Sequence, residues 1–74
     1  TGRAIVDALL DAASGLLATQ GLAGMTTNAV AERAGVSVGS LYQYFPNKQA
    51  LVSAVSDRLN AALVAEVERL VASD

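Results

Sequence analysis

Three short interruptions divide the sequence into four segments, and this division limits the possible folds more than any other feature. The interruptions are Gly21–Gly24 ("GLAG"), Gly35–Ser37 ("GVS") and Phe45–Asn47 ("FPN"). Glycine commonly caps the end of a helix, and the residue before a proline is disfavoured in helical conformation. The segments between them lack strand-like alternation, and the chain has no internal repeat. The sequence therefore predicts an all-α fold of four helices, the middle two of which are short.

The first and last segments both have the spacing of amphipathic helices. From Arg3 to about Gln20, the apolar positions lie on one helix face: Ile5, Leu9, Ala12, Ala13, Leu16 and Leu17. In the last segment, which Asn47 can cap, they recur mostly every four residues: Leu51, Val55, Leu59, Leu63, Val67 and Leu70. A helix from Lys48 to Ala72 would have about 25 residues and a length of roughly 37 Å. We expect this helix to extend past a core built from three helices.

Each of the two short segments follows hydroxyl side chains that are suited to N-caps. Thr26 and Thr27 open a helix of about eight residues that ends at Gly35, and a helix this short is stable only when packed. Ser37 precedes the next helix, Val38 to about Tyr44. Both helices are therefore expected to depend on the core for their stability.

Two short helices joined by the tight "GVS" turn match a helix-turn-helix, which we assign to residues 27–44. Ala31, on the inner face, leaves room for the second helix, and Gly35 permits the sharp turn. Val30, Val36 and Leu41 are then expected to pack together, which leaves the second helix free to enter a major groove. Any three-helix bundle contains two helices joined by a turn, however. This spacing alone does not decide whether the chain binds DNA.

Composition argues against several kinds of function. The chain has 74 residues with no cysteine and no histidine, and its seven acidic residues are dispersed. We therefore predict no disulfide, no metal site, no cofactor and no catalytic residue, so an enzyme is the least favoured class. No uninterrupted apolar run approaches the roughly 18 residues of a membrane span, and the start lacks a signal-peptide pattern. We expect a cytoplasmic protein that does not contact a membrane.

The net charge of −2, from five basic and seven acidic residues, argues mildly against nucleic acid as a partner. Between Thr26 and Lys48, however, the charged residues are Arg33, Lys48 and Glu32; two cations and one anion give a local balance of +1. Hydroxyl groups and helix N-termini also contact phosphates without a full charge. A DNA surface with so few cations is predicted to have a shallow salt dependence.

The stretch from Thr26 to Leu51, "TTNAVAERAGVSVGSLYQYFPNKQAL", resembles the DNA-binding domain of the tetracycline-repressor (TetR/AcrR-like) family of bacterial regulators. The matching positions are Gly21, Thr26, Thr27, Ala31, Ala34–Ser37, Gly39–Tyr42, Tyr44, Phe45, Asn47, Lys48, Ala50 and Leu51. The resemblance is close over residues 21–55. The first helix and the rest of the fourth match by pattern only.

The resemblance implies a homodimeric, ligand-responsive repressor that binds a palindromic operator in double-stranded DNA. Residues 1–47 would form the three-helix DNA-binding core, and residues 48–74 the helix that links it to a second domain. In the family, that C-terminal domain binds a small-molecule effector and holds the dimer together, and it is not present in the 74 residues. We therefore interpret the chain as a fragment of a longer protein.

The second helix of the helix-turn-helix is the predicted recognition helix. Val38 and Ser40 lie near its N-terminus, where a methyl group can contact thymine and a hydroxyl can bond a base edge. Gly39 has no side chain and lets the helix end approach the duplex closely. Gln43 is a further candidate, for adenine, although its side chain is equally compatible with water. By resemblance, Tyr44 contacts the DNA backbone or a thymine methyl group.

The predicted phosphate contacts are Thr26, Thr27, Ser37, Tyr42 and Lys48. Tyr42 is assigned by resemblance, through its hydroxyl; the alternative is a half-buried ring whose hydroxyl meets only water. Lys48 opens the last helix, where its charge opposes the helix dipole, so its position makes more sense with a phosphate nearby. The three hydroxyl residues lie at helix starts, where they also serve as ordinary N-caps. Phe45 has no polar group and is predicted to be part of the core.

A second hypothesis is a helical protein-interaction module that keeps this fold without binding DNA. The low number of basic residues is its main support. Binding of the full-length dimer to a mixed pool of duplexes distinguishes the two hypotheses.

Overall fold

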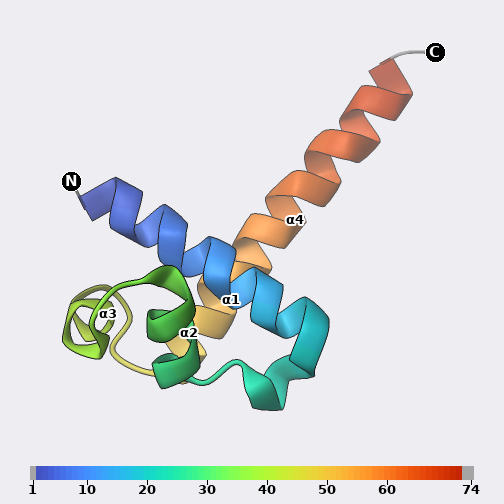
Figure 1. Cartoon of the computed structure of the whole chain (residues 1–74). Helices are drawn as coiled ribbons and strands as arrows, with labels where there is room; N and C mark the ends of the chain where they lie inside the picture. The colour runs from blue at the N-terminus through green and yellow to red at the C-terminus, as the bar shows by residue number, and fades with distance from the viewer. Residues whose placement is uncertain (1, 73–74) are drawn as a thin grey trace.

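The computed structural model describes residues 2–72 and consists of four helices over that range (Figure 1). They are α1 (Gly2–Gly24), α2 (Thr27–Ala34), α3 (Val38–Tyr44) and α4 (Lys48–Ala72). No strand occurs in the described part of the chain. The predicted all-α fold, with α2 and α3 forming the helix-turn-helix and a long fourth helix, is therefore confirmed.

The end of α1 differs from the sequence-based expectation of a turn over "GLAG". Gly21 does interrupt the helix, with φ of 75° and ψ of −178°. L side chains rarely adopt a backbone conformation with this positive φ, which explains why glycine stands there. Beyond the kink, residues 22–24 form a further helical segment instead of an open turn. The expectation was therefore correct about the position of the break and wrong about the conformation of residues 22–24.

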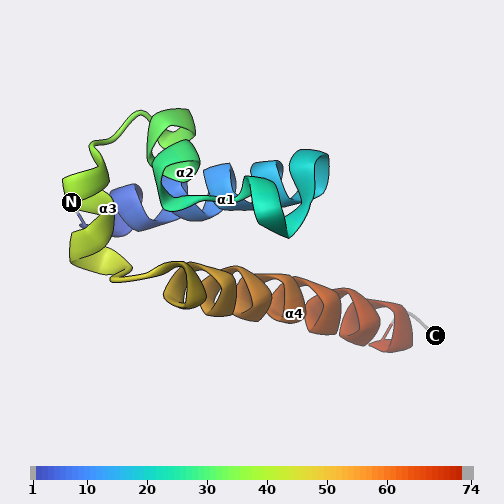
Figure 2. The same cartoon turned by 90° about the horizontal axis from the view of Figure 1, so that it is seen from below.

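The helices are arranged around α1. In Figure 2, α1 lies between α2 and α4, and Figure 1 shows that α1 and α4 cross. Both views place α3 at the end of the molecule opposite the C-terminal end of α4. The described chain measures 47 × 29 × 19 Å along its principal axes, and the projecting end of α4 accounts for the long dimension.

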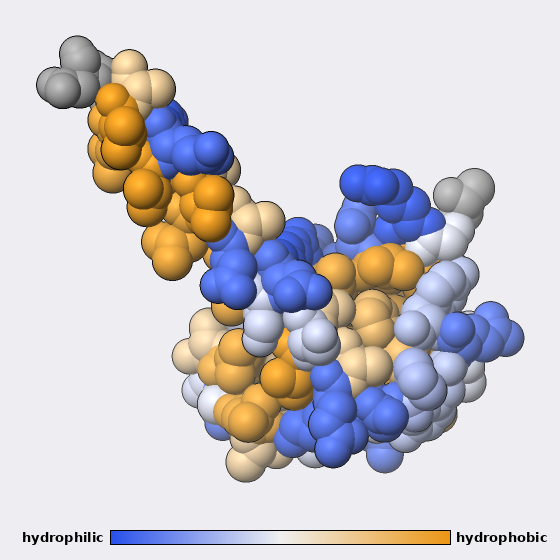
Figure 3. Space-filling view, turned by 180° about the vertical axis from the view of Figure 1, so that it is seen from behind, coloured by the Kyte–Doolittle hydropathy of each residue, from blue (hydrophilic) through white to orange (hydrophobic). Residues whose placement is uncertain are grey.

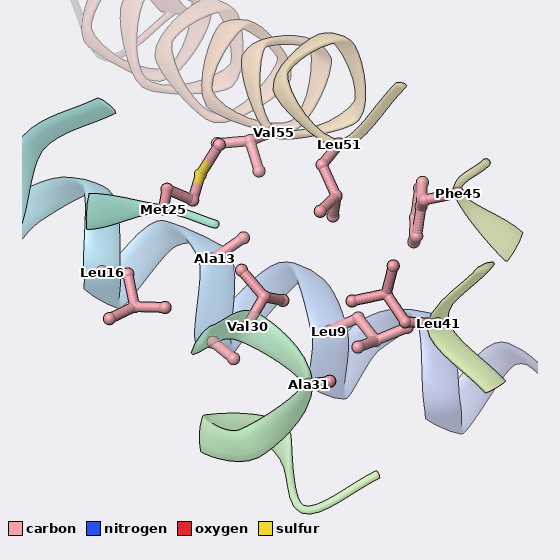
Figure 4. Packing of buried hydrophobic residues seen from close by; sticks show 11 residues of the cluster. Leu9, Ala13, Leu16, Met25, Val30, Ala31, Leu41, Phe45, Leu51 and Val55 are labelled. Atoms are coloured by element: carbon pink, nitrogen blue, oxygen red, sulfur yellow. The ribbon is translucent and has the colours of Figure 1, made fainter. Parts of the chain in front are cut away.

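A small cluster of buried apolar side chains joins the four helices (Figure 4). Its members are Leu9, Ala12, Ala13, Leu16, Met25, Val30, Ala31, Leu41, Phe45, Leu51 and Val55. Leu41 is the only α3 residue among them and is fully buried. Phe45 is also buried, as predicted. Three alanines and two valines supply much of the cluster, and these small side chains bury little apolar area. Since α3 contributes only Leu41, little apolar area holds this helix in place.

Sequence periodicity identified most of the core but not all of it. Ile5 and Leu17, which the pattern places on the buried face, are only partly buried and pack against its edge. Met25 lies outside every helical pattern because it is between α1 and α2, yet it is fully buried. Figure 4 shows its side chain directed toward Val55 of α4. The flexible methionine side chain thus fills the space between the helix connection and α4.

Three side-chain caps fix the starts of the later helices, as the sequence predicts. The Thr26 hydroxyl, the Ser37 hydroxyl and the Asn47 carbonyl oxygen each accept from the backbone amide three residues later, at 3.1, 3.1 and 2.8 Å. Such a cap contributes about 1 kcal/mol to stability. At the other end of α2, Gly35 adopts the left-handed conformation with φ of 76°. Its amide donates to the carbonyl of Glu32, at 3.2 Å, and the chain reverses into the turn.

By length and mean hydropathy of 1.2, α1 would pass as a membrane-spanning helix, the only one in residues 2–72. The sequence-based expectation relied on uninterrupted apolar runs and did not anticipate this result. The most deeply buried positions of α1, from Leu9 to Leu16, belong to the core that this helix shares with α2 and α4. Only 22% of that apolar window is buried, so the core accounts for part of the apolar character of α1.

The outer half of α4 has apolar side chains that are open to solvent (Figure 3). They are Leu59, Leu63, Val64, Val67, Leu70 and Val71, each at least half exposed. Arg58 pairs with Asp11 of α1 at the point where α4 leaves the core, and Arg69 pairs with Glu66 one turn away. The expected extension of α4 beyond the core is confirmed.

Candidate nucleic-acid interface

The first turn of α3 presents the predicted base-contacting residues at an open surface. Val38 is 36% exposed and Gly39 is exposed, with only the Ser37 hydroxyl near the position a Cβ would take, at 3.9 Å. Ser40 is half-buried and Gln43 is exposed. The structure thus places all five predicted base-contacting residues on one short helix, with Tyr44 as its last residue. Leu41 anchors this helix from the opposite side.

Tyr44 has a neighbour that the sequence did not reveal. A Cβ placed on Gly2 would lie 3.1 Å from the Tyr44 hydroxyl and 3.4 Å from its ring, so the tyrosine packs on the start of α1. The side chain remains 37% exposed. Tyr44 therefore lies at the seam between α3 and α1, and its predicted DNA contact would be made from that seam.

Tyr42 and Thr27 come together across the helix-turn-helix. Their hydroxyl oxygens are 2.9 Å apart, and either group can donate the hydrogen bond. Tyr42 is in α3 and 46% exposed, whereas Thr27 is the first residue of α2 and half-buried. The structure therefore joins two of the predicted phosphate-contacting residues directly.

A second hydroxyl pair lies at the start of α3. Ser37 accepts from the Ser40 amide as N-cap, and its own hydroxyl donates to the Ser40 hydroxyl at 3.0 Å. This arrangement leaves the Ser40 hydrogen free to donate elsewhere, because a serine hydroxyl has one hydrogen and two lone pairs. The Thr26 hydroxyl likewise accepts a hydrogen bond from a backbone amide, that of Ala29, as the N-cap of α2.

Lys48 lies in a different setting from the hydroxyl residues. It is half-buried and lines a hollow of about 460 Å³ together with Leu22, Gln49, Val52 and Ser53. Leu22 is 53% exposed at the edge of this hollow. Lys48 shares this hollow with none of the other residues predicted to contact phosphate.

Arg33 is the only cation of the helix-turn-helix, residues 27–44, and its guanidinium lies against α1. A Cβ at Gly15 would approach its Nη2 atom to 2.6 Å, so the glycine makes room for the arginine. The sequence indicated only that Gly15 would weaken α1 and offered no sign of this contact. Among the described residues no charged side chain is buried, and no cluster of three potential metal ligands occurs. α2 and α3 carry several hydroxyl groups and only two charged side chains, Glu32 and Arg33. Such neutral hydroxyl groups can donate hydrogen bonds to phosphate oxygens without a full charge.

Comparison with known proteins assigns the chain to a family. Residues 9–55, which include α2, α3 and the whole of the turn between them, match the family described as bacterial regulatory proteins, tetR family. The chain is 37% identical over 60 residues to the nucleoid occlusion factor SlmA of Haemophilus ducreyi, covering 80% of this chain and 30% of that protein. It is 44% identical over 62 residues to the HTH-type transcriptional repressor KstR of Rhodococcus jostii, covering 84% of this chain and 26% of that protein.

No solved structure matches the chain significantly. The chain spans less than a third of the length of the two relatives, so the likeness is confined to one part of each. In this chain, the family match covers 47 of the 74 residues and includes every predicted base-contacting and phosphate-contacting residue. The chain belongs to the tetR family of bacterial regulatory proteins.

Proposed function

We propose that this chain is the sequence-specific DNA-binding domain of a transcriptional repressor. The observation that carries the proposal is α3, a helix that buries a single leucine and exposes its first turn. A core helix of the same length would bury a full face, whereas a recognition helix needs its outer face free for the major groove. One of the relatives, KstR, is named as an HTH-type transcriptional repressor.

In this proposal the first turn of α3 reads bases and the hydroxyl groups around it bind phosphates. Val38 supplies a methyl contact and Ser40 a hydrogen bond, while Gly39 allows close approach. Tyr44 and Gln43 lie further along the helix and contact the backbone or a base edge. The hydroxyls of Thr26, Thr27 and Tyr42 and the ammonium of Lys48 contact phosphates and fix the register of the helix on the duplex. The Ser37 hydroxyl contacts a phosphate when its hydrogen turns away from Ser40.

We further propose a homodimer whose two α3 helices lie about one DNA turn, roughly 34 Å, apart on a palindromic operator. Residues 1–47 would be the DNA-binding core, and α4 would connect it to a second domain that dimerises and binds a small-molecule effector. The apolar outer half of α4 supports this role, because exposed apolar residues in such number mark a surface that another element covers. The protein would act in the cytoplasm, without contact to a membrane and without a cofactor.

Selection from a pool of random duplexes by the full-length protein, at low salt, tests the proposal. We expect enrichment of a palindrome with two half-sites about 10 base pairs apart. Affinity should fall only gently with salt, because each neutralised phosphate adds about 0.9 to the logarithmic slope and cations are few. Failure to enrich any sequence would contradict the proposal and favour a helical protein-interaction module, for which the exposed residues of α4 would be the contact surface.

A further inference from the structure

The hydrogen bond between Thr27 and Tyr42 belongs neither to a helix cap nor to the buried core. Thr26, not Thr27, provides the N-cap of α2, since its hydroxyl accepts from the Ala29 amide at 3.1 Å. Tyr42 is not held by burial either, because its side chain is 46% exposed. The two hydroxyls nevertheless meet at 2.9 Å across 15 positions of sequence. The bond thus fixes the end of an exposed side chain.

Counting hydrogens limits what the two groups can do together. Each hydroxyl has one hydrogen, and one of the two hydrogens lies in the bond between them. Phosphate oxygens only accept hydrogen bonds, so the pair retains a single donor for a phosphate, whichever of the two oxygens carries it. A hydroxyl that accepts one hydrogen bond also becomes a better donor, because linked hydrogen bonds polarise one another.

We propose that Thr27 and Tyr42 bind one phosphate as a single unit, in which Thr27 is a positioning residue that holds and polarises the Tyr42 hydroxyl. This inference rests on the proposed DNA-binding function and changes the role of Thr27 from an independent contact to an indirect one. Two independent contacts would require both hydrogens to point at phosphates, which would break the observed bond. Holding an exposed phenol in advance also lowers the entropy lost when DNA binds.

Four variants of the full-length protein test this unit: Thr27→Val, Thr27→Ser, Tyr42→Phe and the double variant Thr27→Val/Tyr42→Phe. The measurement is Kd by fluorescence anisotropy, for the duplex that the parent protein enriches and for a scrambled duplex. Thr19→Val is the matched control, because it removes an exposed threonine hydroxyl that bonds only within α1, to the Gly15 carbonyl. Circular dichroism confirms that each variant is folded.

We expect Tyr42→Phe to weaken binding about 3- to 10-fold on both duplexes, since it removes one hydrogen bond that carries no sequence information. Thr27→Val should weaken binding about 2- to 5-fold in the parent but less than twofold in the Tyr42→Phe background. Thr27→Ser, which keeps the hydroxyl, and Thr19→Val should remain within twofold of the parent.

Three results would overturn the proposal. Equal losses from Thr27→Val in both backgrounds would mean independent contacts, and no loss in the parent would mean that Thr27 does not position the phenol. A Thr27→Ser protein as weak as Thr27→Val would show that the methyl group, not the hydroxyl, matters. If the parent protein itself binds no duplex, the proposed function fails and the inference fails with it, which separates that case from a failure of the unit alone.

Discussion

The two helices of the helix-turn-helix have nearly the same length and the same kind of cap, but they differ in how they are held. α2 has eight residues and buries Val30 and Ala31 against α1, while α3 has seven and buries only Leu41. The start of each is fixed by a hydroxyl that accepts from the backbone at 3.1 Å. Capping at the helix starts is therefore equal, and the two helices differ in their C-caps, left-handed Gly35 and extended Phe45, and in tertiary contact.

This difference shows how a thin core can support a surface that must stay open. α2 commits its apolar face to the core and positions the turn, whereas α3 keeps most of its side chains in solvent and depends on one leucine. A helix of seven residues has little stability of its own. Its placement depends on the buried Leu41 and the Ser37 cap, with further contacts from Tyr42 to α2 and from Tyr44 to α1.

The largest effect is expected from Leu41→Ala compared with Val30→Ala. Loss of the Leu41 side chain should cost about 2 to 4 kcal/mol, and Val30→Ala roughly 2 kcal/mol. Because Leu41 is the buried anchor of α3, its variant should lose DNA affinity even at temperatures where most of the helical signal remains. Thermal unfolding by circular dichroism and anisotropy with the enriched duplex measure the two quantities.

The comparison of α2 and α3 would break down if both variants lost DNA affinity in proportion to their unfolded fraction. In that case α3 would not be held separately from the rest of the core. An α3 that stays bound to DNA in Leu41→Ala would contradict the anchoring role of this leucine.

Gly35→Ala should have the next largest effect. A residue with Cβ is strained at a φ of 76°, and we expect a loss of about 1 to 2 kcal/mol in the free energy of unfolding. The turn would either strain or widen, which would also change the placement of α3 relative to α2. Chemical denaturation measures the stability, and an unchanged midpoint would show that the turn tolerates a side chain.

Local chemistry explains which parts of the fold could be predicted from the sequence. The caps at Thr26, Ser37 and Asn47 and the left-handed Gly35 are set by residues within a few positions, so their signals are readable along the chain. Met25 carried no such signal, because a single apolar residue between helices has no period. Its burial depends on α4, which is distant in sequence.

The contacts that α1 makes with Tyr44 and Arg33 could not be predicted for the same reason. The packing of Tyr44 on Gly2 and of Arg33 on Gly15 joins residues that are 42 and 18 positions apart (44 − 2 and 33 − 15). The sequence and the family resemblance predicted a set of DNA-contacting residues, and most of the α3 residues among them are exposed. The roles of the individual residues stay predictions until binding is measured.

Gly39→Ala is expected to act in the opposite sense to Gly35→Ala. Gly39 lies in α3 with only the Ser37 hydroxyl near the Cβ position, at 3.9 Å, so alanine should raise stability by about 0.5 to 1 kcal/mol. The added methyl group would, however, stand between the helix and the duplex and weaken binding. A Gly39→Ala protein that is more stable and binds DNA as tightly as the parent would show that this turn does not approach the bases closely.

The smallest effects on stability, and the most specific effects on function, are expected from Val38→Ala and Ser40→Ala. Val38 is exposed and Ser40 half-buried on the first turn of α3, so each change should move stability by no more than about 0.5 kcal/mol. One methyl or one hydroxyl contact to a base should contribute less than the roughly 1 to 3 kcal/mol of a bidentate contact. Each substitution should therefore change the preferred base without abolishing binding. Selection from random duplexes, carried out in parallel with the parent protein, measures this preference.

Gln43→Ala decides the open alternative at the next turn: a changed preference at an adenine position places its amide on a base edge, and an identical selected sequence places it in water.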